Sequence, residues 1–135
     1  MAVRVAIGVL AAVALAWLVL GLRAARLESE AADLVGRSPA DAPQDRLERA
    51  RDAYRRARSF NADAAPEVRE AGLLNFDGRR REALELLRDV VRSEPENPDA
   101  WILIAGVAAE LDPPLAERAR RRARELNPFL FRRRR

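Results

Sequence analysis

The sequence predicts an all-α protein in which an N-terminal transmembrane helix precedes a short stack of helical hairpins. An unbroken apolar run occupies residues 5–22, and apolar residues recur at helical spacing through most of the remaining chain. A pattern of small and apolar residues also returns every 33 residues, a period typical of stacked helical hairpins. Its three copies are Ala50-x3-Tyr54-x2-Ala57-x4-Ala62, Ala83-x3-Leu87-x2-Val90-x4-Pro95 and Ala116-x3-Arg120-x2-Ala123-x4-Pro128.

The apolar run is long enough to cross a bilayer. Its 18 residues contain no charge, and Arg4 and Arg23 flank them. At 1.5 Å per residue they span about 27 Å, close to the ~30 Å hydrocarbon thickness. A cleavable signal peptide is the alternative, because Ala14-x-Ala16 is similar to a signal peptidase site. Cleavage there would leave residues 17–22 as an exposed apolar start, so we expect residues 1–22 to be a retained anchor.

Residues 23–43 are expected to form a helical stalk extension and a linker. The apolar stripe continues at helical spacing as far as Val35, and Gly36 then ends the helix. A glycine and two prolines mark residues 36–43 as the linker. Asp41 and Gln44 have the spacing of a capping box at the start of the next helix.

The domain at residues 44–128 is expected to contain five helices. The first spans about residues 43–60, and the second begins near Pro66 and ends before the turn Asp77-Gly78. A third, over residues 79–93, carries a wide apolar stripe. Asn97-Pro98 and Asp112-Pro113 supply the start signals of the last two helices.

Residues 44–128 resemble tetratricopeptide repeats, whose helix pairs follow W-x2-L-G-x2-Y, then A-x3-F-x2-A, then a proline. The resemblance is strongest in the second copy of the repeat and in Trp101-x2-Ile104-Ala105-x2-Ala108, which follows it. Val68-x2-Ala71-Gly72-x2-Asn75 lacks the large aromatic residues, and Arg120 replaces a bulky apolar one. A terminal repeat needs a polar outer face, which would explain Arg120. Ankyrin repeats are set aside because their T-P-L-H motif is missing, whereas a plain helical bundle remains an alternative.

The resemblance implies a short TPR-like superhelix that binds a protein or peptide on the concave side, which the first helices of the hairpins form. The residues at those positions are Val68, Gly72, Asn75, Asp99, Ile102, Gly106 and Glu110. The alternative is that they pack against the preceding helix or the stalk.

Two further contact sites are expected at the ends of the chain. Gly8, Ala12 and Ala16 would present a flat strip of small residues to another transmembrane helix. The apolar and basic tail at residues 129–135 has the composition of a contact with an anionic bilayer. Its lipid-contacting residues would be Phe129, Phe131, Arg132, Arg133, Arg134 and Arg135. Alternatively, the two phenylalanines cover the end of the last hairpin.

Charge and composition argue against nucleic-acid binding and catalysis. All 25 basic residues are arginines, and 20 of them lie in residues 23–131 together with all 21 acidic residues, so the folded part is nearly neutral. Cysteine, histidine and lysine are absent, which leaves the serines and Tyr54 without an activating base. We therefore expect no enzyme activity, no cofactor and no metal site.

These features predict a single-pass, membrane-anchored scaffold that binds a protein partner, in a bacterial envelope assembly. An accessory subunit of a membrane enzyme or transporter, recognised through its transmembrane helix, is the alternative. Arginine-mediated nucleic-acid binding is a third, less favoured hypothesis. The positive-inside count is nearly even across the apolar run, and the short N-terminal tail favours an extracytoplasmic domain. The sequence leaves the oligomeric state open.

Overall fold

A computed structural model describes residues 2–36, 39 and 42–131, and over these residues the protein is entirely helical, with no strand. The all-α prediction and the long apolar N-terminal helix are thereby confirmed. The six helices, followed by one 3-10 turn, are α1 (Ala2–Val35), α2 (Gln44–Arg58), α3 (Ala65–Phe76), α4 (Arg80–Ser93), α5 (Pro98–Val107), α6 (Pro113–Leu126) and η2 (Pro128–Phe131).

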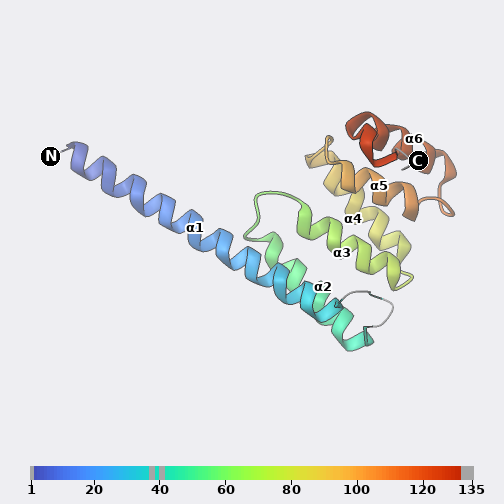
Figure 1. Ribbon diagram of the computed structural model, residues 1–135, viewed down its shortest axis with the longest axis horizontal. Helices are drawn as coiled ribbons and strands as arrows, with labels where there is room; N and C mark the ends of the chain where they lie inside the picture. Colours follow the sequence, from blue (N-terminus) through green and yellow to red (C-terminus); the bar gives the residue numbers. More distant parts are fainter. Residues whose placement is uncertain (1, 37–38, 40–41, 132–135) are drawn as a thin grey trace.

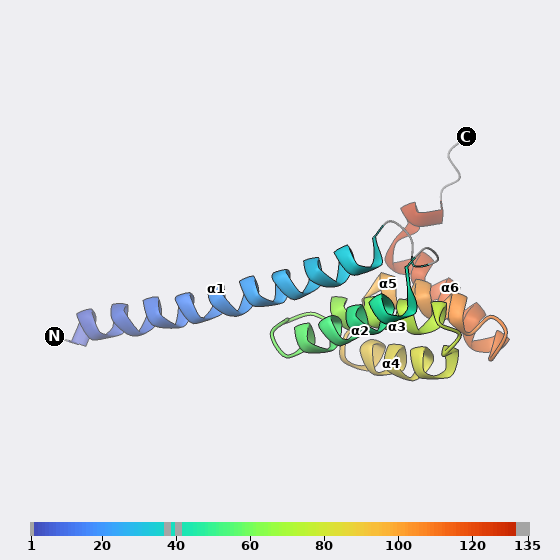
Figure 2. The ribbon, with the colours of Figure 1, turned by 90° about the horizontal axis from the view of Figure 1, so that it is seen from below.

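The N-terminal half of α1 projects away from the other helices (Figures 1 and 2). Its large apolar side chains are open to solvent, with Leu10 69%, Trp17 65% and Leu18 68% exposed. Within the segment Ile7–Val35 an 18-residue window has a mean hydropathy of 2.2, and the helix is long and apolar enough to cross a membrane. A signal sequence would satisfy the same criterion of length and composition.

The C-terminal part of α1 packs against α2, and the two helices form the first hairpin. Ala24 and Ala31 of α1 are buried, and Ala31, which is fully buried, belongs to a cluster on which Leu34 and Val35 also pack. The other members of this cluster are Leu47, Ala50, Ala53, Tyr54 and Leu73. Small side chains let helix backbones approach closely, so the alanines on α1 and α2 explain this contact. The expected stalk is therefore one wall of a hairpin as far as Val35.

Glycine and cap residues set the helix ends where the sequence predicts them. Gly36 and Gly78 have φ of 64° and 77°, a left-handed conformation that glycine adopts without steric cost. The side chain of Asn97 accepts a hydrogen bond from the Ala100 amide (3.1 Å), and Asp112 accepts one from Leu115 (3.0 Å). These contacts begin α5 and α6.

The remaining helices form two further hairpins, α3–α4 and α5–α6, and each helix packs against its neighbours in chain order (Figure 1). Helix α3 also contacts α5. Their shared core is centred on Leu87, Ile104 and Val107, each at most 1% exposed. Trp101 packs on this core and donates a hydrogen bond from Nε1 to the Pro95 carbonyl, 2.9 Å away.

The 33-residue pattern corresponds to the buried faces of α2, α4 and α6. Ala50, Ala83 and Ala116 occupy equivalent positions, and each is at most 1% exposed. Arg120, which breaks the pattern, is partly exposed and pairs with Glu117. Apart from Arg120, the first three positions of each copy thus pack one helix against its neighbours, whereas the fourth position (Ala62, Pro95 and Pro128) is exposed.

Candidate interaction surfaces

The seven residues predicted to bind a partner are distributed over α3, α5 and the turn after α5. Val68 is partly buried against the core, and a Cβ atom at Gly72 would lie 3.9 Å from Leu103 Cδ2. Asn75 is half-buried. The α3 members therefore lie at or beside the contact between α3 and α5, where little of their surface is free.

The α5 members are more accessible. Asp99, Ile102 and Gly106 are exposed and follow one another at helical spacing, so they form one stripe along α5. Glu110 follows α5 in the turn and pairs with Arg80 at the start of α4. We call Asp99, Ile102 and Gly106 the α5 stripe. The structure thus joins three of the seven residues into one exposed surface.

The two terminal sites differ in how much of them the structure describes. Gly8, Ala12 and Ala16 are exposed on the projecting part of α1, and a Cβ atom at Gly8 would meet nothing within 4 Å. Phe129 is 70% exposed. The side chain of Phe131 and residues Arg132–Arg135 lie outside the described part of the chain.

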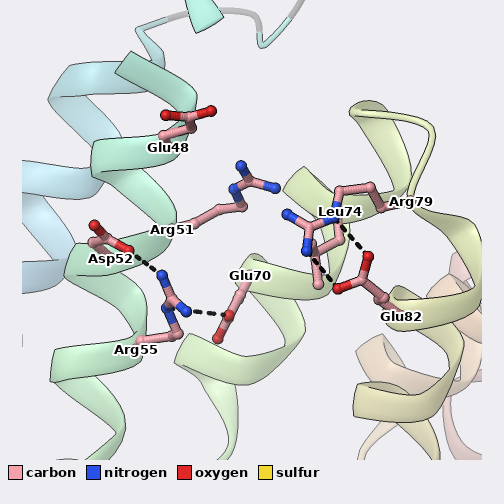
Figure 3. A pocket seen from close by; sticks show the side chains of 8 residues that line it. All are labelled: Glu48, Arg51, Asp52, Arg55, Glu70, Leu74, Arg79 and Glu82. Carbon is pink, nitrogen blue, oxygen red and sulfur yellow. Dashed lines mark hydrogen bonds and ion pairs between the residues drawn. The ribbon is translucent and has the colours of Figure 1, made fainter. Parts of the chain in front are cut away.

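The structure also contains a charged cleft that sequence reasoning missed, between α2, α3 and the start of α4 (Figure 3). Its volume is about 330 Å³. Seven of its eight lining residues carry charge: Glu48, Arg51, Asp52, Arg55, Glu70, Arg79 and Glu82, with Leu74 as the eighth.

Arg51 forms one wall of the charged cleft and ties α2 to the end of α3. Its side chain is only 9% exposed, and Nη1 lies 3.0 Å from Asp77 Oδ2. Asp77 Oδ1 accepts a second hydrogen bond from Gln44 Nε2 at 2.9 Å. Gln44 is therefore engaged with the end of α3, and none of the described side chains caps the start of α2. Asp41, its expected capping partner, lies outside the described residues.

Glu70 is the most enclosed carboxylate of the charged cleft. The residue is 7% exposed, and its Oε2 has no hydrogen-bond partner among the described residues. Oε2 lies 3.7 Å from Nη1 of Arg58, and Oε1 lies 3.9 Å from Nε of Arg55. Burial raises the pKa of Glu70 above its ordinary value of 4.5, against the opposing effect of these two guanidinium groups. Figure 3 shows Arg55 between Asp52 and Glu70.

Most charges in the cleft are thus paired, as Arg79 is with Glu82, and the pairs Arg51–Asp77 and Arg55–Glu70 link α2 to α3. A sequence signal for it existed. Arg51 lies on the same helical face as Leu47 and Tyr54, three and four residues away. The many exposed arginines on the same helix mask this signal in the sequence.

The described residues offer no candidate metal site. No group of three or more acidic residues is placed to hold a metal ion in this part of the chain. Tyr54 is buried against α1, and this burial raises the pKa of its hydroxyl. Comparison with protein-family models, curated proteins and solved structures gave no match to this chain.

Proposed function

We propose that this protein is a single-pass membrane scaffold whose TPR-like hairpins present the α5 stripe to a protein partner. The observation that carries the proposal is the continuity of α1, which runs without a break from an exposed apolar rod into the first hairpin. A large exposed apolar surface needs a lipid or protein environment. The hairpins that follow leave Asp99, Ile102 and Gly106 exposed along one side of α5.

Two measurements test the anchor: alkaline extraction of membranes, and the mass of the isolated protein. Full-length protein should stay with the membrane pellet at alkaline pH, and deletion of residues 2–22 should release it. The mass of the protein isolated from its own membrane distinguishes an anchor from a signal peptide. A mass that lacks residues 1–16 would contradict the anchor.

The partner surface is tested by site-specific photo-crosslinking in native membranes. A photoreactive residue at Ile102, which is 36% exposed, should give a defined protein adduct that Asp99→Arg abolishes. The matched control carries the same photoreactive residue in place of Arg121, which is exposed on α6. Adducts that are equal at both positions, or unaffected by Asp99→Arg, would argue against the α5 stripe.

The alternative function, an accessory subunit recognised through α1, is supported by the exposed strip Gly8, Ala12 and Ala16. Gly8→Ile should then abolish crosslinking between α1 and its partner helix while leaving adducts at Ile102 unchanged. We propose an extracytoplasmic domain in either case. Because the chain has no cysteine, an Ala109→Cys variant labelled with an impermeant maleimide on intact cells tests this orientation.

A further inference from the structure

The helical domain begins immediately where the apolar rod ends. Leu22, the last residue of the apolar run, is 52% exposed, and Ala24, two residues later in the same helix, is 4% exposed. No flexible segment separates the rod from the domain, since both belong to α1. A rod embedded in a bilayer would therefore hold the domain directly at the lipid surface.

The turn between α2 and α3 lies at the end of the domain that faces the rod (Figures 1 and 2). Asn61 in this turn donates a hydrogen bond from Nδ2 to Glu28 Oε1 on α1, 2.7 Å away, and Arg69 pairs with the other oxygen. Glu28 follows Leu22 by about 9 Å along the helix, at 1.5 Å per residue. The headgroup layer is roughly 5–8 Å thick on each side of the hydrocarbon. The α2–α3 turn is therefore placed at the edge of the headgroups.

Three arginines near this end have no carboxylate partner. Arg23 and Arg26 follow the apolar run on α1, and Arg56 lies in the last turn of α2. Among the described residues no carboxylate lies within ion-pairing distance of any of them, and Arg56 Nε contacts only the Asp52 carbonyl, at 3.4 Å. By contrast, Arg55 and Arg58 in the same turn of α2 are engaged with acidic residues.

We propose that Arg23, Arg26 and Arg56, together with residues 59–62 of the α2–α3 turn, form a surface that contacts the headgroups of anionic phospholipids. This inference rests on the membrane anchor of the proposed function. A transmembrane helix can tilt and shift in depth at a modest cost in free energy. Contacts at its end therefore decide whether the domain lies against the membrane or away from it. Each arginine near an anionic surface favours the docked position about fivefold, and tethering removes most of the entropic cost of the contact.

The rest of this end of the domain has the opposite charge. The amide of Ala64 donates a hydrogen bond to Glu94 Oε1, 2.8 Å away, which brings the α4–α5 turn beside the α2–α3 turn. A hollow there is lined by four acidic residues, Asp63, Glu94, Glu96 and Asp99. Anionic lipid should therefore attract the side of the domain next to α1 and repel this hollow, which fixes the direction in which the domain tilts.

The test uses full-length protein in vesicles of phosphatidylcholine and phosphatidylglycerol. Because cysteine is absent, one fluorophore can be attached at a time through Ala14→Cys on the rod, Ala62→Cys in the α2–α3 turn, or Ala109→Cys in the α5–α6 turn at the opposite end. All three alanines are exposed. A nitroxide on the lipid headgroup should quench the probe at residue 62 more strongly than the probe at residue 109. Equal quenching at the two positions would overturn the proposal.

Charge variants then test the role of the arginines, at an ionic strength where the original chain is half docked. Arg26→Gln with Arg56→Gln should lower the ratio of docked to undocked protein, read from the probe at residue 62, about fivefold for each arginine removed. Arg81→Gln with Arg118→Gln removes the same charge from two exposed arginines on α4 and α6, and should change nothing. Equal effects of the two double variants, or no effect of the first, would overturn the proposal.

Failure of the anchor has a separate signature. A nitroxide on the acyl chain should quench the probe at residue 14. If it does not, the rod is outside the bilayer, and the proposed function fails together with the surface that rests on it. Quenching at residue 14 without preferential headgroup quenching at residue 62 would instead reject the headgroup contact alone.

Discussion

Burial separates the arginine pairs of this protein into two classes. Pairs such as Arg49–Asp45 and Arg92–Asp89 join neighbouring turns of one helix, and their side chains are more than half exposed. Exposed pairs of this kind add little to stability, because water already solvates both charges. The pair between Arg51 and Asp77 differs, because it joins two helices and the arginine is largely removed from water.

Loss of Asp77 should therefore be costly. Asp77→Ala leaves the guanidinium of Arg51 buried without its counter-charge, and we expect the free energy of unfolding to fall by about 3 kcal/mol. Asp45→Ala, which removes one partner of an exposed pair, is the control and should leave stability nearly unchanged. Urea unfolding of the full-length protein in mild detergent, followed by circular dichroism, measures both. A loss for Asp77→Ala no larger than that of the control would show that Arg51 is well solvated in the native state.

Glu70 should make stability depend on pH. The raised pKa means that the folded protein favours the protonated carboxyl group more than the unfolded chain does. This contribution to stability is complete below the ordinary pKa of 4.5 and is lost as the pH rises through the higher pKa of the folded state. Glu70→Gln keeps the shape without the charge, so it should be at least as stable as the original chain at pH 7 and should flatten the pH profile in this window.

The control for this measurement is Glu85→Gln, which changes an exposed glutamate on α4. It should leave the pH profile unchanged. If Glu70→Gln instead destabilises the protein at pH 7, the attraction of Arg55 and Arg58 outweighs the desolvation of the carboxylate.

Single helices in this protein begin and end through backbone chemistry that short sequences encode. Gly36 ends α1 in a left-handed conformation, whereas Gly106 lies inside α5, exposed and without positive φ. The same substitution should therefore have opposite effects at the two glycines.

Gly36→Ala should destabilise the protein by about 1 kcal/mol, because a side chain is strained at φ of 64°. Gly106→Ala should stabilise it by roughly 0.5–1 kcal/mol, since alanine loses less backbone entropy in a helix and its Cβ would meet nothing within 4 Å. Thermal unfolding of the full-length variants in detergent measures both changes. Effects of the same sign would contradict the assignment of either site.

At the scale of the whole molecule, α1 has two roles that meet within a few residues. Its first part is an exposed apolar rod, and its last part, through Ala24 and Ala31, covers the apolar face of α2. The folded domain therefore starts near residue 23, although the repeated pattern starts on α2.

Truncation should show where the domain begins. A fragment of residues 23–135 keeps the first hairpin and should unfold cooperatively as a soluble protein. A fragment of residues 36–135 exposes the apolar cluster around Leu47, Tyr54 and Leu73, so it should lose helix content and self-associate. Circular dichroism and size-exclusion chromatography of the two fragments make the comparison, and equal stability would show that α1 contributes nothing to the fold.

The sequence by itself determined the features that depend on neighbouring residues. The apolar run predicted the rod, Gly36 and Gly78 predicted two helix ends, and Asn97 and Asp112 predicted two helix starts, because each signal acts within one or two turns. The 33-residue pattern predicted which faces of α2, α4 and α6 are buried, since the same contact is made in each hairpin.

Only the tertiary structure decided which distant residues meet. It placed the end of α1 against α2, directed Gln44 to Asp77, and buried Arg51 and Glu70 between helices. It also brought the α2–α3 turn to Glu28. These outcomes depend on how closely two helices approach and on how much water remains between them. The spacing of residues along one helix determines neither quantity.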